Sequence, residues 1–301
     1  MRRSDLLLGL GRRLMLLLCF FILGYALTVG LSLVLGKLLA GNMPALLRIT
    51  TVLQDICVFI LPALATACII CRKPAELLAL IKGLGLRTWV AIGLILFVSI
   101  PALEAVIYWN ANLHFPPALA ALEESARAME ATASAMTETM LRSNTSPIGL
   151  VLNILIIGVF AGFSEELLFR GCFQRILTTG GVNPHLAIWL VAAIFSGFHF
   201  QLFGFVPRLL LGAYFGYLLL WTGSVRASML AHILNNSIYV VAAWSQLLRN
   251  PEAPLQSDAG GELYPPLLIG LSVAATAAAL AWLYTGIRRD KQKFGKSADN
   301  S

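Results

Sequence analysis

Long apolar segments, each close to the length of a membrane-spanning helix, alternate along the chain with short polar stretches. About 20 predominantly apolar residues are enough for a helix to cross the hydrocarbon core of a bilayer. Eight segments approach or exceed that length: Leu14–Gly36, Ile49–Cys71, Thr88–Trp109, Pro147–Leu177, Pro184–Phe203, Pro207–Thr222, Ala227–Leu248 and Pro265–Ile287. The pattern predicts an all-α fold, a polytopic transmembrane helix bundle of about eight spans.

Two of the connections between these segments are also expected to contain helix. The stretch from Ala111 to Ser146 is rich in alanine and glutamate, which predicts a helix outside the membrane. The stretch from Pro74 to Leu86 has the composition of a short helix lying at the membrane interface.

Composition and charge agree with a membrane protein and argue against a nucleic-acid partner. The 301 residues are 58% hydrophobic and only 12% charged, whereas a soluble domain carries about 25% charged residues. The net charge is +7, but the basic residues flank apolar segments and form no patch on a soluble domain. Basic flanks mark cytoplasmic loops, so we expect both termini in the cytoplasm. The five scattered cysteines do not suggest a disulfide framework.

Three fragments place ionisable or strongly polar side chains inside the apolar segments. A charged group at the bilayer centre costs about 3 kcal/mol even on lenient insertion scales, so such groups suggest a function. The fragments supply two carboxylates, an arginine, two imidazoles and a carboxamide, which suit activation of water and stabilisation of an oxyanion. They are Glu165-Glu166-x-x-x-Arg170, Phe195-x-x-x-His199 and His232-x-x-x-Asn236.

The spacing of these residues gives them different interpretations. Glu166 and Arg170 are four residues apart on one helix face and are expected to pair. Glu165 lies about 100° around the helix, so it is left free to act as a general base. The turn centred on Val182 is equally far from Glu165 and His199, which predicts that the two lie at the same depth.

The remaining positions are interpreted by the same helical spacing. His232 and Asn236 share one face and make a plausible oxyanion hole. Phe195, four residues before His199, is expected to pack on the imidazole ring and fix its orientation. The pair Gly212 and Gly216 is a close-packing signal without catalytic content.

In combination and in this order, the three fragments resemble the CPBP family of intramembrane proteases. That family includes the Ras-converting CAAX prenyl endopeptidases and bacterial bacteriocin-processing and self-immunity proteins. The resemblance implies an endopeptidase that hydrolyses a peptide bond of a membrane-associated or lipidated substrate. It implies that Glu165 and His199 activate water, that His232 and Asn236 stabilise the tetrahedral intermediate, and that Glu166 and Arg170 support the site.

The resemblance also organises the chain into three parts. Residues 1–146 form N-terminal membrane helices with interfacial and extracytoplasmic segments, and residues 147–248 form the CPBP-type catalytic helix core. Residues 249–301 hold an extracytoplasmic loop, the last transmembrane helix and a basic cytoplasmic tail. The expected partners are a membrane protein or peptide substrate and the lipid bilayer, and the expected location is the bacterial plasma membrane.

Dependence on a metal is left open by the sequence. The family is often called a metalloprotease family, but the His-Glu-x-x-His zinc pattern is absent. Glu165, His199 and His232 could hold zinc with one open position, and the same three groups could also work without a metal.

Two other classes of function remain as alternatives: a proton-coupled transporter, and a non-catalytic immunity or regulatory scaffold. A proton relay needs ionisable groups across the full bilayer depth, whereas here they cluster at similar depth, which favours hydrolysis. Asp55 and Glu104 also lie in apolar segments without matched partners, and we interpret them as packing or pathway residues.

Overall fold

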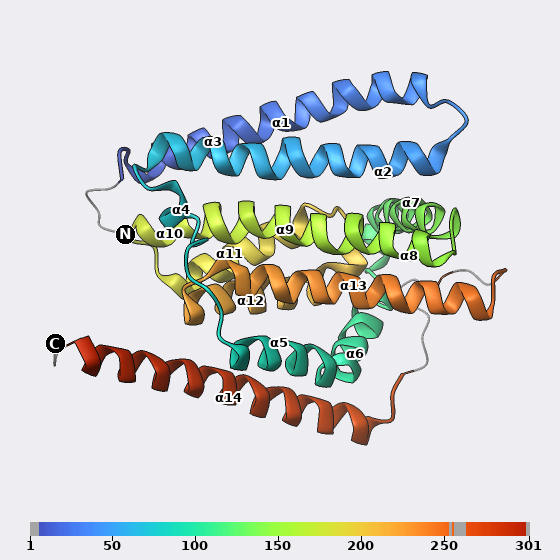
Figure 1. Cartoon of the computed structure of the whole chain (residues 1–301). Helices are drawn as coiled ribbons and strands as arrows, with labels where there is room; N and C mark the ends of the chain where they lie inside the picture. The colour runs from blue at the N-terminus through green and yellow to red at the C-terminus, as the bar shows by residue number, and fades with distance from the viewer. Residues whose placement is uncertain (1–5, 253–254, 256–262, 299–301) are drawn as a thin grey trace.

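Helices form the regular structure of this chain, apart from one isolated bridge between Leu6 and Cys71 among the described residues. The computed structural model describes residues 6–252, 255 and 263–298. Figure 1 shows that the long helices other than α7, which is seen nearly end-on, run roughly along one common direction, with the start of α1 and the end of α14 at the same end of the bundle. We call this the terminal end and the opposite one the α7 end. The all-α polytopic bundle predicted from the sequence is confirmed.

The first helices form a hairpin on one side of the bundle. α1 leads away from the terminal end and a second, continuous helical rod returns to it. Gly24 on α1 permits the close approach, because a Cβ atom there would lie 1.9 Å from the carbonyl oxygen of Cys57. The elements are α1 (Leu10–Leu38), α2 (Met43–Gln54), the π-helix η2 (Asp55–Ile60) and α3 (Leu61–Ile70).

The opposite side of the bundle is built from a bent helix and the last helix. The bend of 49° between α5 and α6 includes Pro101, which has no N–H to continue the helical ladder. Ser272 of α14 accepts a hydrogen bond from the Ala102 N–H at 3.1 Å and so satisfies one group freed by the bend. These elements are α5 (Leu86–Val98), α6 (Ile100–Ala111) and α14 (Pro266–Ala298).

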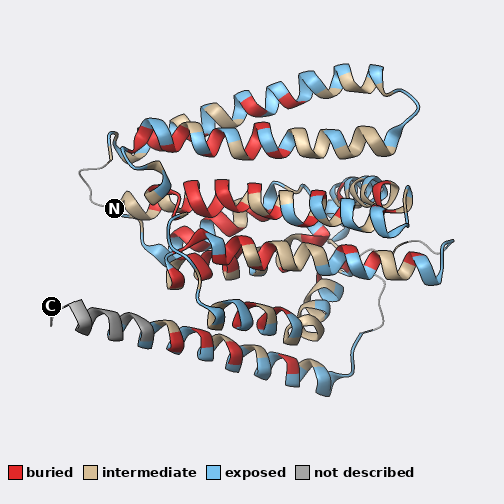
Figure 2. Cartoon of the chain, viewed as in Figure 1, coloured by how far each residue is buried: buried red, intermediate tan, exposed pale blue. Residues whose placement is uncertain are grey.

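Between these two sides lies a long rod in which α-helical and π-helical turns alternate. Ser146 caps its start by accepting from the Gly149 N–H, with Pro147 at the first helical position. Buried residues concentrate on this central layer (Figure 2). The rod consists of α8 (Pro147–Asn153), η4 (Ile154–Phe160), α9 (Ala161–Glu166), η5 (Leu167–Gln174) and α10 (Arg175–Thr179).

Three further helices complete the central layer beside the rod. The side chain of Asn183 caps the start of α11, which stops after 14 residues. α12 then returns to the terminal end, where Gly223 ends it in the left-handed conformation (φ 70°). The elements are α11 (Pro184–Gly197), the 3₁₀ turn η6 (Leu202–Gly204), α12 (Phe205–Thr222) and α13 (Val225–Arg249).

The α7 end carries the polar helix expected between Ala111 and Ser146. It is α7 (Ala120–Arg142), preceded by the 3₁₀ turn η3 (Pro117–Leu119). Glu123 accepts from the Phe115 N–H at 2.7 Å and pairs with Arg127 at 2.8 Å. Both contacts favour the ionised carboxylate, and they lower the pKa of Glu123 to about 2. The polar helix is therefore tied to the chain that precedes it.

The structure differs from the sequence prediction in the number of spans and in two boundaries. Among the described residues, five helices are long and apolar enough to cross a membrane, or six if the bent pair counts as one span, so the count of eight is not confirmed. The segment expected to run from Pro184 to Phe203 is helical only to Gly197. The interfacial helix expected over Pro74–Leu86 is reduced to α4 (Pro74–Leu77), because Ala79 adopts a positive φ of 55°, which a regular helix does not allow.

Candidate active site

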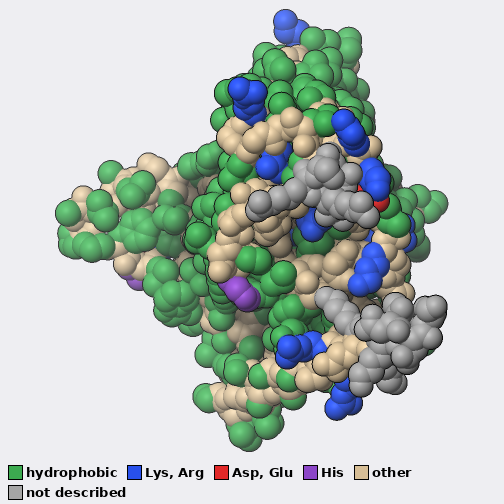
Figure 3. All heavy atoms as spheres, turned by 90° about the vertical axis from the view of Figure 1, so that its left-hand side faces the viewer, with side chains coloured by type: hydrophobic (Ala, Val, Ile, Leu, Met, Phe, Trp, Pro, Cys, Tyr) green, Lys and Arg blue, Asp and Glu red, His purple; other side chains and the backbone are tan. Residues whose placement is uncertain are grey.

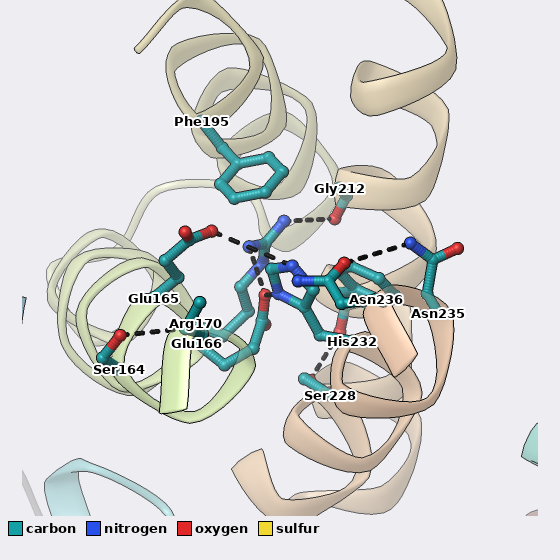
Figure 4. A network of polar contacts seen from close by, with 12 residues as sticks. Ser164, Glu165, Glu166, Arg170, Phe195, Gly212, Ser228, His232, Asn235 and Asn236 are labelled. Atoms are coloured by element: carbon teal, nitrogen blue, oxygen red, sulfur yellow. Dashed lines mark hydrogen bonds and ion pairs between the residues drawn. The ribbon is translucent and has the colours of Figure 1, made fainter. Parts of the chain in front are cut away.

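Glu166, the last residue of α9, is the junction of a fully buried polar network (Figure 4). Its Oε1 atom lies 2.7 Å from Nη1 of Arg170, so the structure contains the pair that the i,i+4 spacing predicts. The same oxygen lies 2.9 Å from Nδ1 of His232. Because a carboxylate can only accept, the proton of this bond sits on Nδ1 of the imidazole. One carboxylate therefore holds both the arginine and the histidine.

Arg170 and Gln174 are held by the two glycines of α12, Gly212 and Gly216. Its Nη2 atom donates to the carbonyl oxygen of Gly212 at 2.8 Å. One turn further on, Gln174 donates to the carbonyl oxygen of Gly216 at 3.1 Å. A Cβ atom on Gly212 would lie 3.0 Å from Nη2 of Arg170. Gly212 thus binds the buried arginine and Gly216 binds Gln174, in addition to the close packing that the sequence predicts for this pair.

His232 is fixed in orientation by two aromatic rings. Phe215 stacks on it with ring centroids 4.9 Å apart and an interplanar angle of 22°. Phe195 meets it edge-on at 5.7 Å. With Nδ1 bound to Glu166, the other nitrogen, Nε2, faces Oε2 of Glu165 at 3.8 Å. The imidazole therefore bridges the two adjacent glutamates.

Glu165 has different surroundings from its neighbour Glu166. Its side chain retains 15% exposure, whereas Glu166 has none. Within the described part of the chain, Oε2 of Glu165 is buried and has no hydrogen-bond partner. The two carboxyl groups are thus separated in role, one anchored and the other available to a reacting group.

His199 lies in the turn that follows α11 and reaches the network through Phe195. Its Nδ1 atom is 2.9 Å from the carbonyl oxygen of Phe195, and the two rings meet edge-on at 5.1 Å, as the spacing predicts. Phe195 touches both imidazoles and lies 4.6 Å from the guanidinium carbon of Arg170. The hydrogen bonds of the described residues include none between His199 and Glu165.

Asn236 is one turn beyond His232 and is bound to the rod. Its Nδ2 atom donates to the carbonyl oxygen of Ile157 at 3.1 Å, and its Oδ1 atom accepts from Asn235 at 3.3 Å. Ile157 belongs to the π-helix η4, and π-helical turns often occur at functional sites. The Nδ2 group of Asn236 has a second N–H, which is not used in the hydrogen bond to Ile157.

Two glycines on the rod bring it close enough to α13 for these contacts. A Cβ atom on Gly162 would lie 2.9 Å from the backbone nitrogen of Ile233. A Cβ atom on Gly158 would lie 2.6 Å from Oγ of Ser237. Without side chains at these positions, the backbones approach closely enough for Glu166 to reach His232.

The residues considered as zinc ligands do not form a three-ligand group in this structure. Among the described residues, no three His, Cys, Asp or Glu side chains are placed to hold one metal ion. Glu165 and His232 approach each other, but Nδ1 of His232 is bound to Glu166, and His199 is connected through Phe195. The chemistry considered below uses no step that passes through a metal.

Asp55 is a buried polar residue at the site that sequence reasoning treated only as a packing or pathway residue. It opens η2, is 2% exposed, and its Oδ1 atom lies within hydrogen-bond distance of Oγ of Ser164, at 3.0 Å. The sequence did show Asp55 as an acidic residue inside an apolar segment. Its partner Ser164 lies 109 positions away, and no spacing rule identifies a partner at that distance.

Comparison with known proteins points to one family for part of the chain. Residues 147–238 match the family model described as type II CAAX prenyl endopeptidase Rce1-like. The uncharacterized protein YpbD of Bacillus subtilis (strain 168) is 25% identical over 91 residues, which are 29% of this chain and 43% of that protein. The chain therefore matches less than half the length of this relative. No solved structure matches.

Proposed function

We propose that this chain, whose residues 147–238 match the type II CAAX prenyl endopeptidase Rce1-like model, is an intramembrane endopeptidase in which Glu165 activates the hydrolytic water. Its substrate is a membrane-associated or lipidated protein or peptide. The observation that carries the proposal is the 3.8 Å approach of Glu165 Oε2 to His232 Nε2, with the other histidine nitrogen fixed by Glu166. Such an arrangement inside an apolar bundle provides a base and a hydrogen-bond donor for one reacting group.

Glu165 acts as the general base in this proposal. Its carboxylate takes a proton from water as the water oxygen attacks the scissile carbonyl carbon. The same group then returns that proton to the leaving amine nitrogen as the C–N bond breaks. His199 assists, because its Nδ1 proton is directed at the Phe195 carbonyl oxygen, which leaves Nε2 as an acceptor that orients the water.

His232 and Asn236 stabilise the oxyanion that forms during the attack. In the form that carries a proton on both nitrogens, His232 donates from Nε2 while Nδ1 stays bound to Glu166. The amide N–H of Asn236 that is not used by Ile157 is the second donor. Preorganised donors of this kind each contribute about 100-fold or more to the rate. Glu166 and Arg170 serve the reaction by holding His232.

The terminal end of the bundle faces the cytoplasm in this proposal, in a bacterial plasma membrane. Figure 3 shows Lys and Arg side chains spread over this end, while hydrophobic side chains cover its flanks. Basic residues concentrate on the cytoplasmic side of membrane proteins. Both termini then lie in the cytoplasm.

The proposal is tested by comparing the termini of membrane proteins, by mass spectrometry, in cells that produce either the wild type or Glu165→Gln. The substitution keeps the shape but removes the base, so cleavage is expected to fall about 100-fold or more. Glu104→Gln, at an exposed position on α6, is the matched control and should give the wild-type termini. Identical termini in all three strains would overturn the protease assignment and favour a non-catalytic scaffold.

Zinc content and the effect of a chelator, measured on the purified protein, decide metal dependence.

A further inference from the structure

A second carboxyl group, that of Asp55, is buried next to the proposed base and comes from outside the family-matched segment. It is 2% exposed, and its Oδ1 atom lies 3.0 Å from Oγ of Ser164, the residue immediately before Glu165. Its Oδ2 atom is buried without a hydrogen-bond partner among the described residues.

The hydrogen bonds of Ser164 indicate which form of Asp55 fits this place. Oγ of Ser164 is 3.0 Å from Asp55 and 3.1 Å from the carbonyl oxygen of Ala161. A hydroxyl group has one proton, and a backbone carbonyl oxygen can only accept. Both contacts are therefore full hydrogen bonds only when Asp55 carries a proton and donates it to Ser164, while Ser164 donates to Ala161.

The surroundings of Asp55 agree with a neutral carboxyl group. η2 packs against α1, α2, α3, α9 and η5, and among the described residues Asp55 contacts Ser164 and forms no ion pair with a cation. The guanidinium of Arg170 is already bound to Glu166 and to Gly212. An ionised carboxylate buried without a cation costs far more than a hydrogen-bonded carboxylic acid.

We propose that Asp55 is a positioning residue for the active site, which in its protonated form holds Ser164 and the helical turn presenting Glu165 without adding a negative charge beside the base. The inference rests on the proposed role of Glu165 and deepens it. It assigns a part of the site to the N-terminal hairpin, because η2 belongs to the rod that follows α1. Substitutions that keep a neutral hydrogen-bond donor at position 55 should then preserve cleavage activity, and apolar substitutions should reduce it.

The first test is an infrared spectrum of the purified protein at neutral pH, which detects the carbonyl stretch of a protonated carboxylic acid. We expect such a band in the wild type and in Glu165→Gln, and its loss in Asp55→Asn. A wild-type spectrum without the band, or a band that Asp55→Asn leaves unchanged, overturns the inference. This measurement needs no activity, so its failure is distinguishable from failure of the protease assignment.

The second test uses a synthetic peptide that spans a cleavage site found in the comparison of termini, with the protein reconstituted in liposomes. Asp55→Asn supplies a neutral amide donor to Ser164 and should keep kcat within about threefold of the wild type. Asp55→Leu removes the donor, and kcat should fall about 10-fold to 100-fold through misplacement of Glu165, at unchanged KM. Asp55→Asn as inactive as Glu165→Gln would show that a charge at position 55 takes part directly. Wild-type kcat in Asp55→Leu would remove the positioning role.

Discussion

Burial of charge explains why the adjacent residues Glu165 and Glu166 have different partners. Glu166 and Arg170 are both fully buried, and a buried charge is tolerated only when it is paired and hydrogen-bonded. Glu166 meets that condition with Arg170 and His232, and Arg170 meets it with Glu166 and Gly212. Glu165 can remain available because its neighbour neutralises the arginine.

Removal of Arg170 should therefore destabilise the fold as well as the site. Arg170→Ala leaves Glu166 buried without its cation, which costs about 3–5 kcal/mol. The matched control is Lys73→Ala, which breaks the exposed ion pair with Glu76 and should cost less than about 1 kcal/mol. The measurement is denaturant unfolding of the purified protein in detergent.

The double variant Glu166→Gln with Arg170→Gln tests the same pair by removing both charges instead of one. It removes both charges, while a glutamine oxygen can still accept from His232. Its stability should recover part of the loss seen in Arg170→Ala. A double variant no more stable than Arg170→Ala would contradict the pairing as the source of the cost.

At the residue scale, the sequence predicted contacts between residues four positions apart but missed contacts between distant helices. The Glu166–Arg170 pair and the packing of Phe195 on His199 follow from a four-residue spacing, which helical geometry makes local. The bond from His232 to Glu166 joins residues 66 positions apart, and that from Ser164 to Asp55 joins residues 109 apart. Such contacts depend on how helices pack, and a single sequence gives no spacing for them.

At the scale of elements, close packing of the rod against α13 sets the geometry of the site. Gly162→Ala places a Cβ atom 2.9 Å from the backbone nitrogen of Ile233, so the two helices must separate. We expect the approach of Glu166 to His232 to lengthen and peptide cleavage to fall. Gly93→Ala in α5 is the matched control, because a Cβ atom there meets nothing within 4 Å. It should be neutral or more stable by up to about 1 kcal/mol, owing to helix propensity. Equal activity of both variants would contradict the packing argument.

The polar helix α7 should contribute to activity through the loop that carries His199. Glu130 on α7 accepts from the Phe203 N–H at 3.2 Å, and the guanidinium of Arg127 lies 4.0 Å from the Phe203 ring centroid. Glu130→Ala is expected to reduce cleavage about tenfold by loosening this loop. Glu124→Ala, at an exposed position on the same helix, should leave cleavage unchanged. The peptide assay in liposomes compares the two, and equal rates would exclude a positioning role for α7.

The existence of the helices was predictable from apolar length, whereas their ends and their π-helical turns were not. α11 ends at Gly197 although the following residues Phe198 and Phe200 are apolar, because Phe200 adopts a positive φ of 53° in the turn. The three π-helices η2, η4 and η5 contain Asp55, Ile157 and Arg170 respectively. Their wider turns are stabilised by tertiary contacts, so hydrophobic periodicity does not reveal them.

At the scale of the whole molecule, the charge distribution gives the bundle an orientation that can be measured. The connection between α3 and α5 lies at the terminal end, where Lys82 donates to the Thr222 carbonyl oxygen at the end of α12. It carries the basic residues Arg72, Lys73 and Lys82, whereas α7 at the opposite end carries four of the 15 acidic residues, Glu123, Glu124, Glu130 and Glu138. By the positive-inside rule we expect the terminal end to face the cytoplasm.

Cysteine labelling tests this orientation in a background in which the five native cysteines are replaced. Gly83→Cys and Glu124→Cys occupy exposed positions at opposite ends of the bundle, and a Cβ atom at Gly83 meets nothing within 4 Å. A membrane-impermeant maleimide should label Glu124→Cys in intact cells, and Gly83→Cys only in inverted vesicles or after permeabilisation. The opposite pattern would place the basic end outside. Hydrolysis on the cytoplasmic side requires the first pattern, since Glu165 and His232 both lie on helices whose connections at the terminal end carry the basic residues.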